Sequence, residues 1–399
     1  MFENNIDTLL ILSPENRFYF SGLNTSLGCV ILKDERKVFI TDFRYEGYAR
    51  KKLSSPWEVV ITKSVDFYDA ISSTLSTVGA NVVGYEDESV TVADFRRLRT
   101  NCGSVAFEPC SAQIAEQRAV KTEEEISKIA AAQLVAQKAL QRVSSSIKIG
   151  VTEREVAAEL LYEMQMLGAE GASFDTIVAF GENSAVPHHK PTSRKLDRND
   201  VILVDMGAKL DGYCSDMTRT FCLGTPCDEL VAIHKVVLEA QEYALANIKA
   251  GMTGLEADSF AREFIIAHGY GKEFGHNLGH GVGVQIHEKP CLGPNSNDIL
   301  KPNMIITVEP GIYIEGSHGI RTENELLCRK GEENEYGQFM YFEDLTYVPI
   351  DLQGVECSLL TDKEKETLNE YHRQVYEKLS PYFEGEEKSW LKHVTREID

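Results

Sequence analysis

The feature that most constrains the fold is an acidic strand–turn–strand segment, VILVDMGAKLDGYCSDMTRTF, in the second half of the chain. Asp205 follows an apolar run, and Asp211-Gly212 predicts a two-residue turn. With that turn, Asp205 faces Thr218 across the hairpin. Because side chains alternate along a strand, Asp216 then points to the same face as Asp205. The segment therefore predicts a hairpin that brings two carboxylates together.

A second segment, MIITVEPGIYIEGSHGIRTENELLC, is also an acidic strand–turn–strand pattern. Its strands flank the turn EGSHG, and Glu309 and Glu323 are equally distant from Gly316 inside that turn. An odd-length loop would place the two glutamates opposite each other on one face. Both hairpins contain apolar runs that predict buried strands, where an unpaired carboxylate is costly. His280, within GHGVGVQIHE, is expected on a third strand beside them.

These residues form a candidate ligand set for two divalent cations. Four carboxylates and one imidazole suit a binuclear site. An acidic residue near a turn is usually just solvated, but two buried pairs and a histidine make that explanation the weaker one. The oxygen-rich set favours Mn²⁺, with Co²⁺ or Zn²⁺ as alternatives. The expected ligands are Asp205, Asp216, His280, Glu309 and Glu323.

Composition excludes several classes of protein. The net charge of −21 argues against binding to nucleic acid or to an anionic membrane. Nine cysteines without a CxxC pair indicate reduced thiols, and hence a cytoplasmic protein. The N-terminus lacks the pattern of a secretory signal, and no apolar run reaches the ~20 residues that span a bilayer.

Three domains are expected in the 399 residues. Residues 1–118 alternate strand and helix patterns without a glycine-rich phosphate loop, which predicts a small α/β domain that binds no cofactor. Residues 119–348 hold two sets of helices, each followed by an acidic hairpin, which suggests an internal duplication. A strand is predicted within YFEDLTYVPID, which begins before residue 349 and ends inside the last domain. Residues 349–399 also predict a helical extension whose charged face could serve a homodimer. The fold class is α+β overall.

Helix starts are marked by capping boxes, in which a threonine is followed three residues later by a glutamate. Three boxes are predicted, at Thr122 and Glu125, at Thr152 and Glu155, and at Thr361 and Glu364.

The sequence resembles a known family. From about residue 120 to 348 it is similar to the M24 "pita-bread" metallopeptidases, which include methionine aminopeptidase, prolidase and aminopeptidase P. The matching stretches are FDTIVAFGENSAVPHH, VDMGAKLDGYCSDMTRTF, GHNLGHGVGVQIHE, VEPGIYI and GIRTEN. The stretches NRFYFSGLN and FITDFRY resemble the creatinase-type N-terminal domain of Xaa-Pro enzymes, and the tail resembles that of larger aminopeptidases P. The resemblance implies a creatinase-like domain followed by a pseudo-symmetric pita-bread domain.

The resemblance also implies roles for the acidic residues. Asp205 would bind one ion, His280 and Glu309 the other, and Asp216 and Glu323 would bridge both. Glu309 is in addition the candidate to accept a proton from water and deliver it to the leaving nitrogen.

Five further residues match polar positions of the family. His287 would stabilise the developing oxyanion, and His188 would contact the substrate around the scissile bond. His276, Tyr313 and Arg321 match residues beside the site and are expected to bind the peptide.

The expected activity is that of an Xaa-Pro aminopeptidase, which releases the residue before proline from peptides with proline in the second position. Prolidases commonly place an arginine beyond the His-Glu motif to bind a dipeptide's carboxylate, and here no arginine occurs from Glu288 to Ile320. This favours the aminopeptidase over the alternative, an Xaa-Pro dipeptidase. A non-catalytic binding protein on the same fold is a third interpretation, disfavoured by the intact ligand set.

Overall fold

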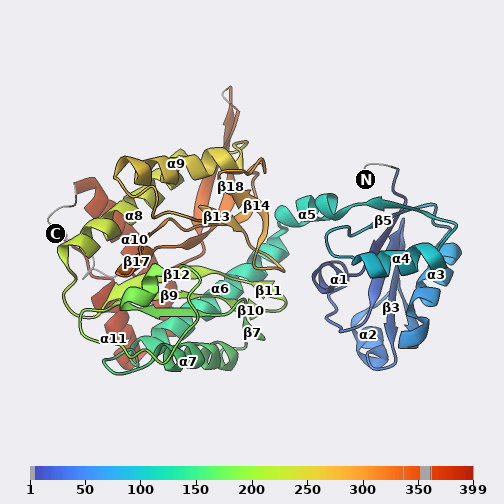
Figure 1. Cartoon of the computed structure of the whole chain (residues 1–399), viewed down its shortest axis with the longest axis horizontal. Coiled ribbons are helices and arrows are strands. Elements are labelled where there is room, and N and C mark those ends of the chain that lie inside the picture. The colour runs from blue at the N-terminus through green and yellow to red at the C-terminus, as the bar shows by residue number, and fades with distance from the viewer. Residues whose placement is uncertain (1–4, 336, 351–359, 361, 399) are drawn as a thin grey trace. The chain divides into compact units, whose positions relative to one another are not determined.

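The computed structural model describes residues 5–335, 337–350, 360 and 362–398. The chain divides into two compact units, Met1–Gln117 and Arg118–Asp399. The first contains a six-stranded sheet with the order β4-β3-β2-β1-β5-β6 (Figure 1). Its strands are β1 (Thr8–Ile11), β2 (Cys29–Lys33), β3 (Arg36–Asp42), β4 (Trp57–Thr62), β5 (Val82–Tyr85) and β6 (Ala106–Pro109). Its helices are α1 (Pro14–Ser21), α2 (Glu46–Lys52), α3 (Phe67–Val78), α4 (Val92–Asn101) and the first residues of α5 (Ser111–Ala119).

The first unit is the mixed α/β domain that the alternating patterns predict. The hairpin of β2 and β3 is antiparallel, whereas β1 with β5, β5 with β6 and β3 with β4 are parallel pairs. Apolar residues of the sheet and of α3 and α4 form a buried core that includes Leu10, Ile31, Ile40, Ile71 and Leu98.

The second unit carries the two acidic hairpins. Its helices are α6 (Glu123–Ser144), α7 (Glu153–Met166), α8 (Asp228–Asn247), α9 (Gly254–Ala267), α10 (Asp362–Leu379) and α11 (Gly385–Val394). Its strands are β7 (Gly171–Ala172), β8 (Ile177–Phe180), β9 (Val201–Met206), β10 (Ala208–Leu210), β11 (Tyr213–Cys214), β12 (Met217–Cys222), β13 (Gly279–Gly281), β14 (Glu288–Leu292), β15 (Ile305–Val308), β16 (Gly311–Ile314), β17 (His318–Arg321), β18 (Asn324–Asn334) and β19 (Gly337–Asp344).

This unit consists of two similar halves. The helix pair α6 and α7 precedes the hairpin of β9 and β12, and the pair α8 and α9 precedes the hairpin of β15 and β18 (Figure 1). The helix caps repeat the same contact: Thr152 of α7 bridges to Lys195, and Thr253 of α9 bridges to Ile299. These equivalent contacts confirm the pseudo-symmetric pita-bread architecture.

The capping boxes at Thr122 and Thr152 form as predicted. A third box, which the sequence analysis missed, begins α9 at Thr253. The box predicted at Thr361 lies outside the described residues.

The first acidic hairpin has the predicted register. Asp211 and Gly212 form the turn with φ of 47° and 78°, the left-handed backbone that a type I′ turn requires. Thr218 is the cross-strand partner of Asp205.

The second hairpin also keeps the predicted register, centred on Gly316, which has φ of 74°. Its ladder is interrupted between β15–β18 and β16–β17, at Glu309 and Glu323. There the backbone N–H of Glu309 donates to Leu278, and that of Glu323 donates to Thr218. The interruption therefore joins this hairpin to β12 and to the segment before β13, and it places both carboxylates between them.

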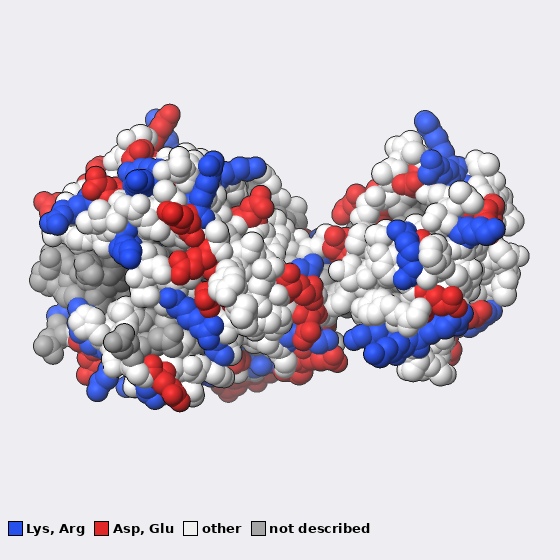
Figure 2. Space-filling view, turned by 90° about the horizontal axis from the view of Figure 1, so that it is seen from below, with Lys and Arg blue, Asp and Glu red and all other residues white. Residues whose placement is uncertain are grey.

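The C-terminal segment packs within the second unit. Apolar residues of α10 and α11, including Val375, Leu379 and Leu391, form a cluster against Leu134 of α6. The strand predicted through YFEDLTYVPID ends at Asp344, because only its first part pairs with the extended β18. Acidic and basic side chains intermingle on the face of this unit shown in Figure 2. Within the described ranges, no helix has the length and apolar character needed to cross a bilayer.

Candidate metal centre

Three of the five predicted ligands converge in one cluster. Asp216 precedes β12, His280 lies on β13 and Glu323 precedes β18. Each offers one ligand atom, and these atoms all lie within 4.8 Å of one another. Because three separate strands supply them, the cluster depends on the pairing of the two hairpins rather than on one local motif.

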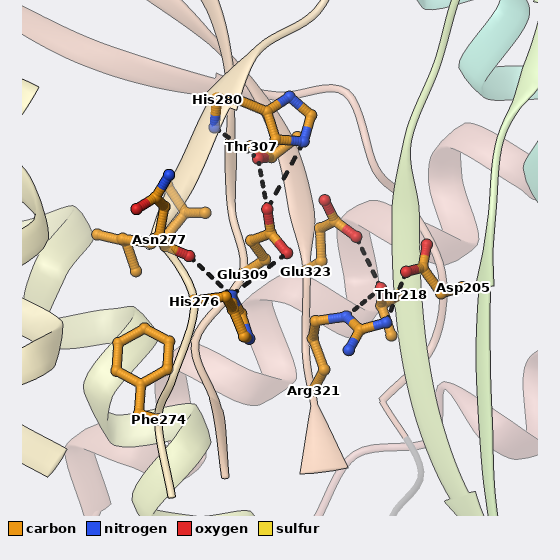
Figure 3. Close-up of polar contacts among 12 residues, drawn as sticks. Asp205, Thr218, Phe274, His276, Asn277, His280, Thr307, Glu309, Arg321 and Glu323 are labelled. Carbon is orange, nitrogen blue, oxygen red and sulfur yellow. Dashed lines mark hydrogen bonds and ion pairs between the residues drawn. The ribbon is translucent and has the colours of Figure 1, made fainter. Parts of the chain in front are cut away.

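Glu309 and Asp205 flank this cluster (Figure 3). Nε2 of His280 lies 3.5 Å from Oδ2 of Asp216 and 3.6 Å from Oε1 of Glu309. Oδ2 of Asp205 accepts a hydrogen bond from Arg321, whereas its buried Oδ1 has no hydrogen-bond partner. All five predicted ligands line one cavity of about 570 Å³.

The carboxylates are crowded and removed from water. Burial, followed by the charges of Glu323 and Asp205, raises the pKa of Asp216 well above its usual value. Burial and the nearby Glu323 likewise raise the pKa of Glu309. Burial and Asp205 raise the pKa of Glu323 to about 8. Carboxylates placed so close together ionise only with a compensating positive charge.

The orientation of His280 fits a cation at the same place. Its Nδ1 lies 3.0 Å from the carbonyl oxygen of Gly281, so Nδ1 carries the hydrogen. Burial, followed by His287, lowers the pKa of His280 to about 4, which leaves the ring neutral. The lone pair of Nε2 therefore faces the carboxylates of Asp216 and Glu309, an arrangement that is repulsive unless a cation binds between them. The donor set fits a divalent metal ion.

A chain of hydrogen bonds runs from Asp205 to His276. Arg321 donates through Nη2 to Asp205 at 2.5 Å and through Nη1 to the hydroxyl of Tyr313 at 2.6 Å. Nδ1 of His276 donates to the carbonyl of Asn277, so its Nε2, 2.9 Å from Tyr313, accepts the phenolic hydrogen. Burial lowers the pKa of His276 to about 3 and raises that of Tyr313 to about 12, so both side chains are neutral.

The structure thus places Arg321 against Asp205, a predicted ligand, rather than at the open part of the cavity: its side chain is 3% exposed. The binding of peptide by His276, Tyr313 and Arg321 stays a prediction.

The two remaining predicted residues, His188 and His287, are exposed and line the cavity. The rings of His287 and His280 meet edge to face with centroids 4.4 Å apart. Burial lowers the pKa of His287, and the neighbouring His188 lowers it further. The lowered pKa keeps the ring of His287 neutral beside the acidic cluster, where it can donate or accept a hydrogen bond with a bound peptide.

Sequence reasoning missed several residues of the site. The hydroxyl of Thr307 accepts the backbone N–H of His280 and lies 3.4 Å from Glu309. Thr307 is two residues before Glu309 on one strand, so the alternation of side chains could have indicated it. Glu325, two residues beyond Glu323, is fully buried, and burial raises its pKa well above the usual value. Lys190 also lines the cavity, and no sequence signal distinguished it.

The pita-bread fold and the acidic, histidine-lined cavity define a metal-dependent hydrolase. Residues 127–330 match metallopeptidase family M24, and residues 338–398 match the C-terminal region of peptidase M24. Residues 1–120 match the creatinase/prolidase N-terminal domain. The chain belongs to metallopeptidase family M24.

Several relatives of this chain are named as Xaa-Pro peptidases. An Xaa-Pro dipeptidase from Pyrococcus furiosus is 38% identical over 329 residues, which cover 82% of this chain and 92% of the relative. The crystal structure of an X-Pro aminopeptidase from Thermotoga maritima is 40% identical with a TM-score of 0.78, covering 86% of this chain and 96% of that one. An Xaa-Pro dipeptidase from Bacillus anthracis is 36% identical with a TM-score of 0.79, covering 87% and 94%.

Proposed function

We propose that this chain is an Xaa-Pro dipeptidase that hydrolyses the bond between the first residue and proline. The observation that carries the proposal is the cavity in which Asp216, His280 and Glu323 converge beside two exposed histidines. The substrate class comes from the relatives, two of whose three names are those of dipeptidases. This reverses the order of the two activities expected from the sequence.

The cofactor of the proposal is a pair of divalent ions, with Mn²⁺ favoured by the oxygen-rich donors. Asp205, Asp216, His280, Glu309 and Glu323 would hold them. The buried Oδ1 of Asp205, which has no hydrogen-bond partner, supports its assignment as a ligand. Bound divalent ions supply a water nucleophile at neutral pH and neutralise the buried carboxylates.

The residues of the chain perform the remaining steps. Glu309 accepts a proton and returns it to the prolyl nitrogen, which has no hydrogen in the peptide and must gain one to leave as an amine. His287 donates a hydrogen bond to the carbonyl oxygen as negative charge develops on it. His188, on the same cavity wall, holds the peptide around the scissile bond. Arg321 fixes the orientation of Asp205 through the bond between Nη2 and Oδ2.

The aminopeptidase stays the second candidate because of a specific observation. No arginine occurs between Glu288 and Ile320 to bind a dipeptide's carboxylate. The relative from Thermotoga maritima is named an aminopeptidase.

One comparison of substrates separates the two activities. The Mn²⁺-loaded protein is assayed with an Xaa-Pro dipeptide and with an Xaa-Pro-Yaa tripeptide that share the same first residue. We expect a higher kcat/KM for the dipeptide. A higher value for the tripeptide would establish the aminopeptidase, and cleavage of neither would reject both.

The metal assignment has its own test. Asp216→Asn keeps the size of the side chain and removes its charge, so we expect the loss of bound metal and of activity together. Asp211→Asn, in the turn of the same hairpin and outside the cavity, is the matched control. Metal content is measured by elemental analysis. An Asp216→Asn protein that keeps its full metal content would contradict the ligand assignment.

A further inference from the structure

The wall of the cavity contains a lysine whose charge has no partner among the described residues. Lys190 is exposed, and within the described part of the chain it makes no hydrogen bond or ion pair. Among the described residues that line the cavity, its lysine and arginine are Lys190 and Arg321. Arg321 is buried and donates to Asp205, Tyr313 and Thr218. Lys190 is therefore the cation that is available to a ligand.

The segment of residues 180–192, which carries Lys190, is held in a fixed conformation by Glu153. This glutamate is 0% exposed. One carboxylate oxygen accepts hydrogen bonds from the backbone of Phe180 and the side chain of Asn183. The other accepts from the ring of His189 and from both the backbone and hydroxyl of Thr192. These bonds immobilise both ends of the segment and turn His189 inward.

The second half of the C-terminal unit has no acidic residue at the position equivalent to Glu153, so the fold does not require one there. The backbone N–H of Glu153 donates to Arg194, and the equivalent bond in the second half runs from Gly254 to Asp298. A glycine thus occupies the position of Glu153 at the start of α9. The buried carboxylate of Glu153 therefore stabilises the cavity-lining segment that carries His188 and Lys190. It is not needed for the start of the helix.

We propose that Lys190 binds the terminal carboxylate of the dipeptide, and so supplies the positive group that the stretch after Glu288 lacks. The inference rests on the proposed dipeptidase activity and deepens it. An extended chain advances only ~3.3–3.6 Å per residue, so the carboxylate of a dipeptide stays inside a cavity of this size when its peptide bond is at the acidic cluster. A lysine ammonium on a flexible stem can then meet it with a charge-assisted hydrogen bond.

The test compares a dipeptide with its amide. Lys190→Met, Lys190→Arg and wild-type proteins, all loaded with Mn²⁺, are assayed with an Xaa-Pro dipeptide and with the same dipeptide amidated at its C-terminus. In Lys190→Met we expect the ratio of kcat/KM for the acid over the amide to fall roughly 10-fold to 100-fold, mainly through KM. Lys190→Arg should keep most of the wild-type ratio. Lys195→Met, at an exposed lysine that follows this segment and lies outside the cavity, should not change it.

Calorimetry with free L-proline gives a readout that does not depend on turnover. The affinity of the Mn²⁺-loaded protein for L-proline should fall in Lys190→Met, whereas any affinity for prolinamide should change far less. An unchanged ratio and an unchanged affinity for proline would overturn the role of Lys190, while dipeptide cleavage by the wild type would leave the proposed function intact. A wild-type protein that cleaves no Xaa-Pro peptide would reject the proposed function and this inference with it.

Discussion

The hydroxyl of Thr218 lies 2.7 Å from Oε2 of Glu323 and connects the two acidic hairpins (Figure 3). Nε of Arg321 donates to this hydroxyl at 3.1 Å, so the hydroxyl hydrogen is directed to Glu323. The carbonyl of Thr218 accepts the backbone N–H of Glu323, and Thr218 is the cross-strand partner of Asp205. One threonine therefore fixes carboxylates from both hairpins relative to each other.

Replacing this threonine should weaken metal binding without removing a ligand. Thr218→Val keeps the shape of the side chain but leaves Oε2 of Glu323 without its donor. Loss of a group that orients a ligand typically costs ~10-fold to 100-fold in metal affinity, and we expect that range for Mn²⁺. Titration calorimetry measures it. Thr41→Val, a buried threonine of the first unit that bonds to a carbonyl, is the control. Equal affinity in the two variants would show that Thr218 does not orient Glu323.

The sequence predicted the parts of the site that depend on local geometry. The turn at Asp211-Gly212 and the turn centred on Gly316 each determine a register, and the register decides which carboxylates share a face. The structure has both registers, and Asp205 lies opposite Thr218 as the turn requires. The family resemblance then extended this local pattern to a whole domain.

The parts that sequence could not predict are contacts between distant segments. The burial of Arg321 against Asp205 depends on how the two hairpins pack, and no spacing within the sequence encodes it. Glu153 stands beside the capping box of α7, where an acidic residue is ordinary. Its burial becomes visible only when His189 and Thr192 return to it from a distant loop.

His287 is expected to affect turnover rather than metal content. In the proposed mechanism it donates to the developing oxyanion, so His287→Ala should lower kcat by roughly 10²-fold to 10³-fold. The side chain is exposed, and its removal should leave the fold and the metal ions in place. Kinetics and elemental analysis of one preparation test both statements. His268→Ala, an exposed histidine on α9's end, serves as control. Loss of metal in His287→Ala would reassign the residue to the ligand set.

The metal-free protein should lose stability as the pH rises from about 6.5 to about 8. Glu323 has its pKa raised from 4.5 to about 8 by burial and Asp205, so in this range the folded protein holds a proton that the unfolded chain has released. Stability then falls with increasing pH. Below about 6.5 the opposite effect of His276 and His280 intervenes, because burial lowers the pKa of both and the unfolded chain binds their protons.

The measurement is the Tm of metal-free and Mn²⁺-loaded protein across this range. We expect a falling Tm only in the metal-free protein, since bound cations remove the cost of ionising the cluster. Glu323→Gln cannot ionise at this position, so the Tm of the metal-free variant should fall less steeply with pH than that of the wild type. A metal-free Tm that is constant or rises from pH 6.5 to 8 would show that the cluster does not hold its protons.

A buried ion triplet beside the site should contribute strongly to stability. Glu288 accepts from Arg118 and, at 3.0 Å, from Lys121, and the three side chains are 3%, 8% and 1% exposed. Burial raises the pKa of Glu288, but Lys121 and Arg118 together lower it below its usual value, so the carboxylate is ionised. Oε1 of Glu288 also accepts the backbone N–H of Gln285, which holds the loop that carries His287.

Glu288→Gln would remove the negative charge that Glu288 supplies to two buried cations. Breaking a buried pair in this way costs about 3–5 kcal/mol, and we expect a loss of that order in the free energy of unfolding. Glu182→Gln is the comparison. Its partner Arg194 keeps an ion pair with Asp200 in this variant, and the Glu182 side chain is 58% exposed. An exposed pair contributes less than about 1 kcal/mol. Urea unfolding of the metal-loaded proteins measures both, and equal losses in the two variants would show that water reaches the triplet and screens its charges.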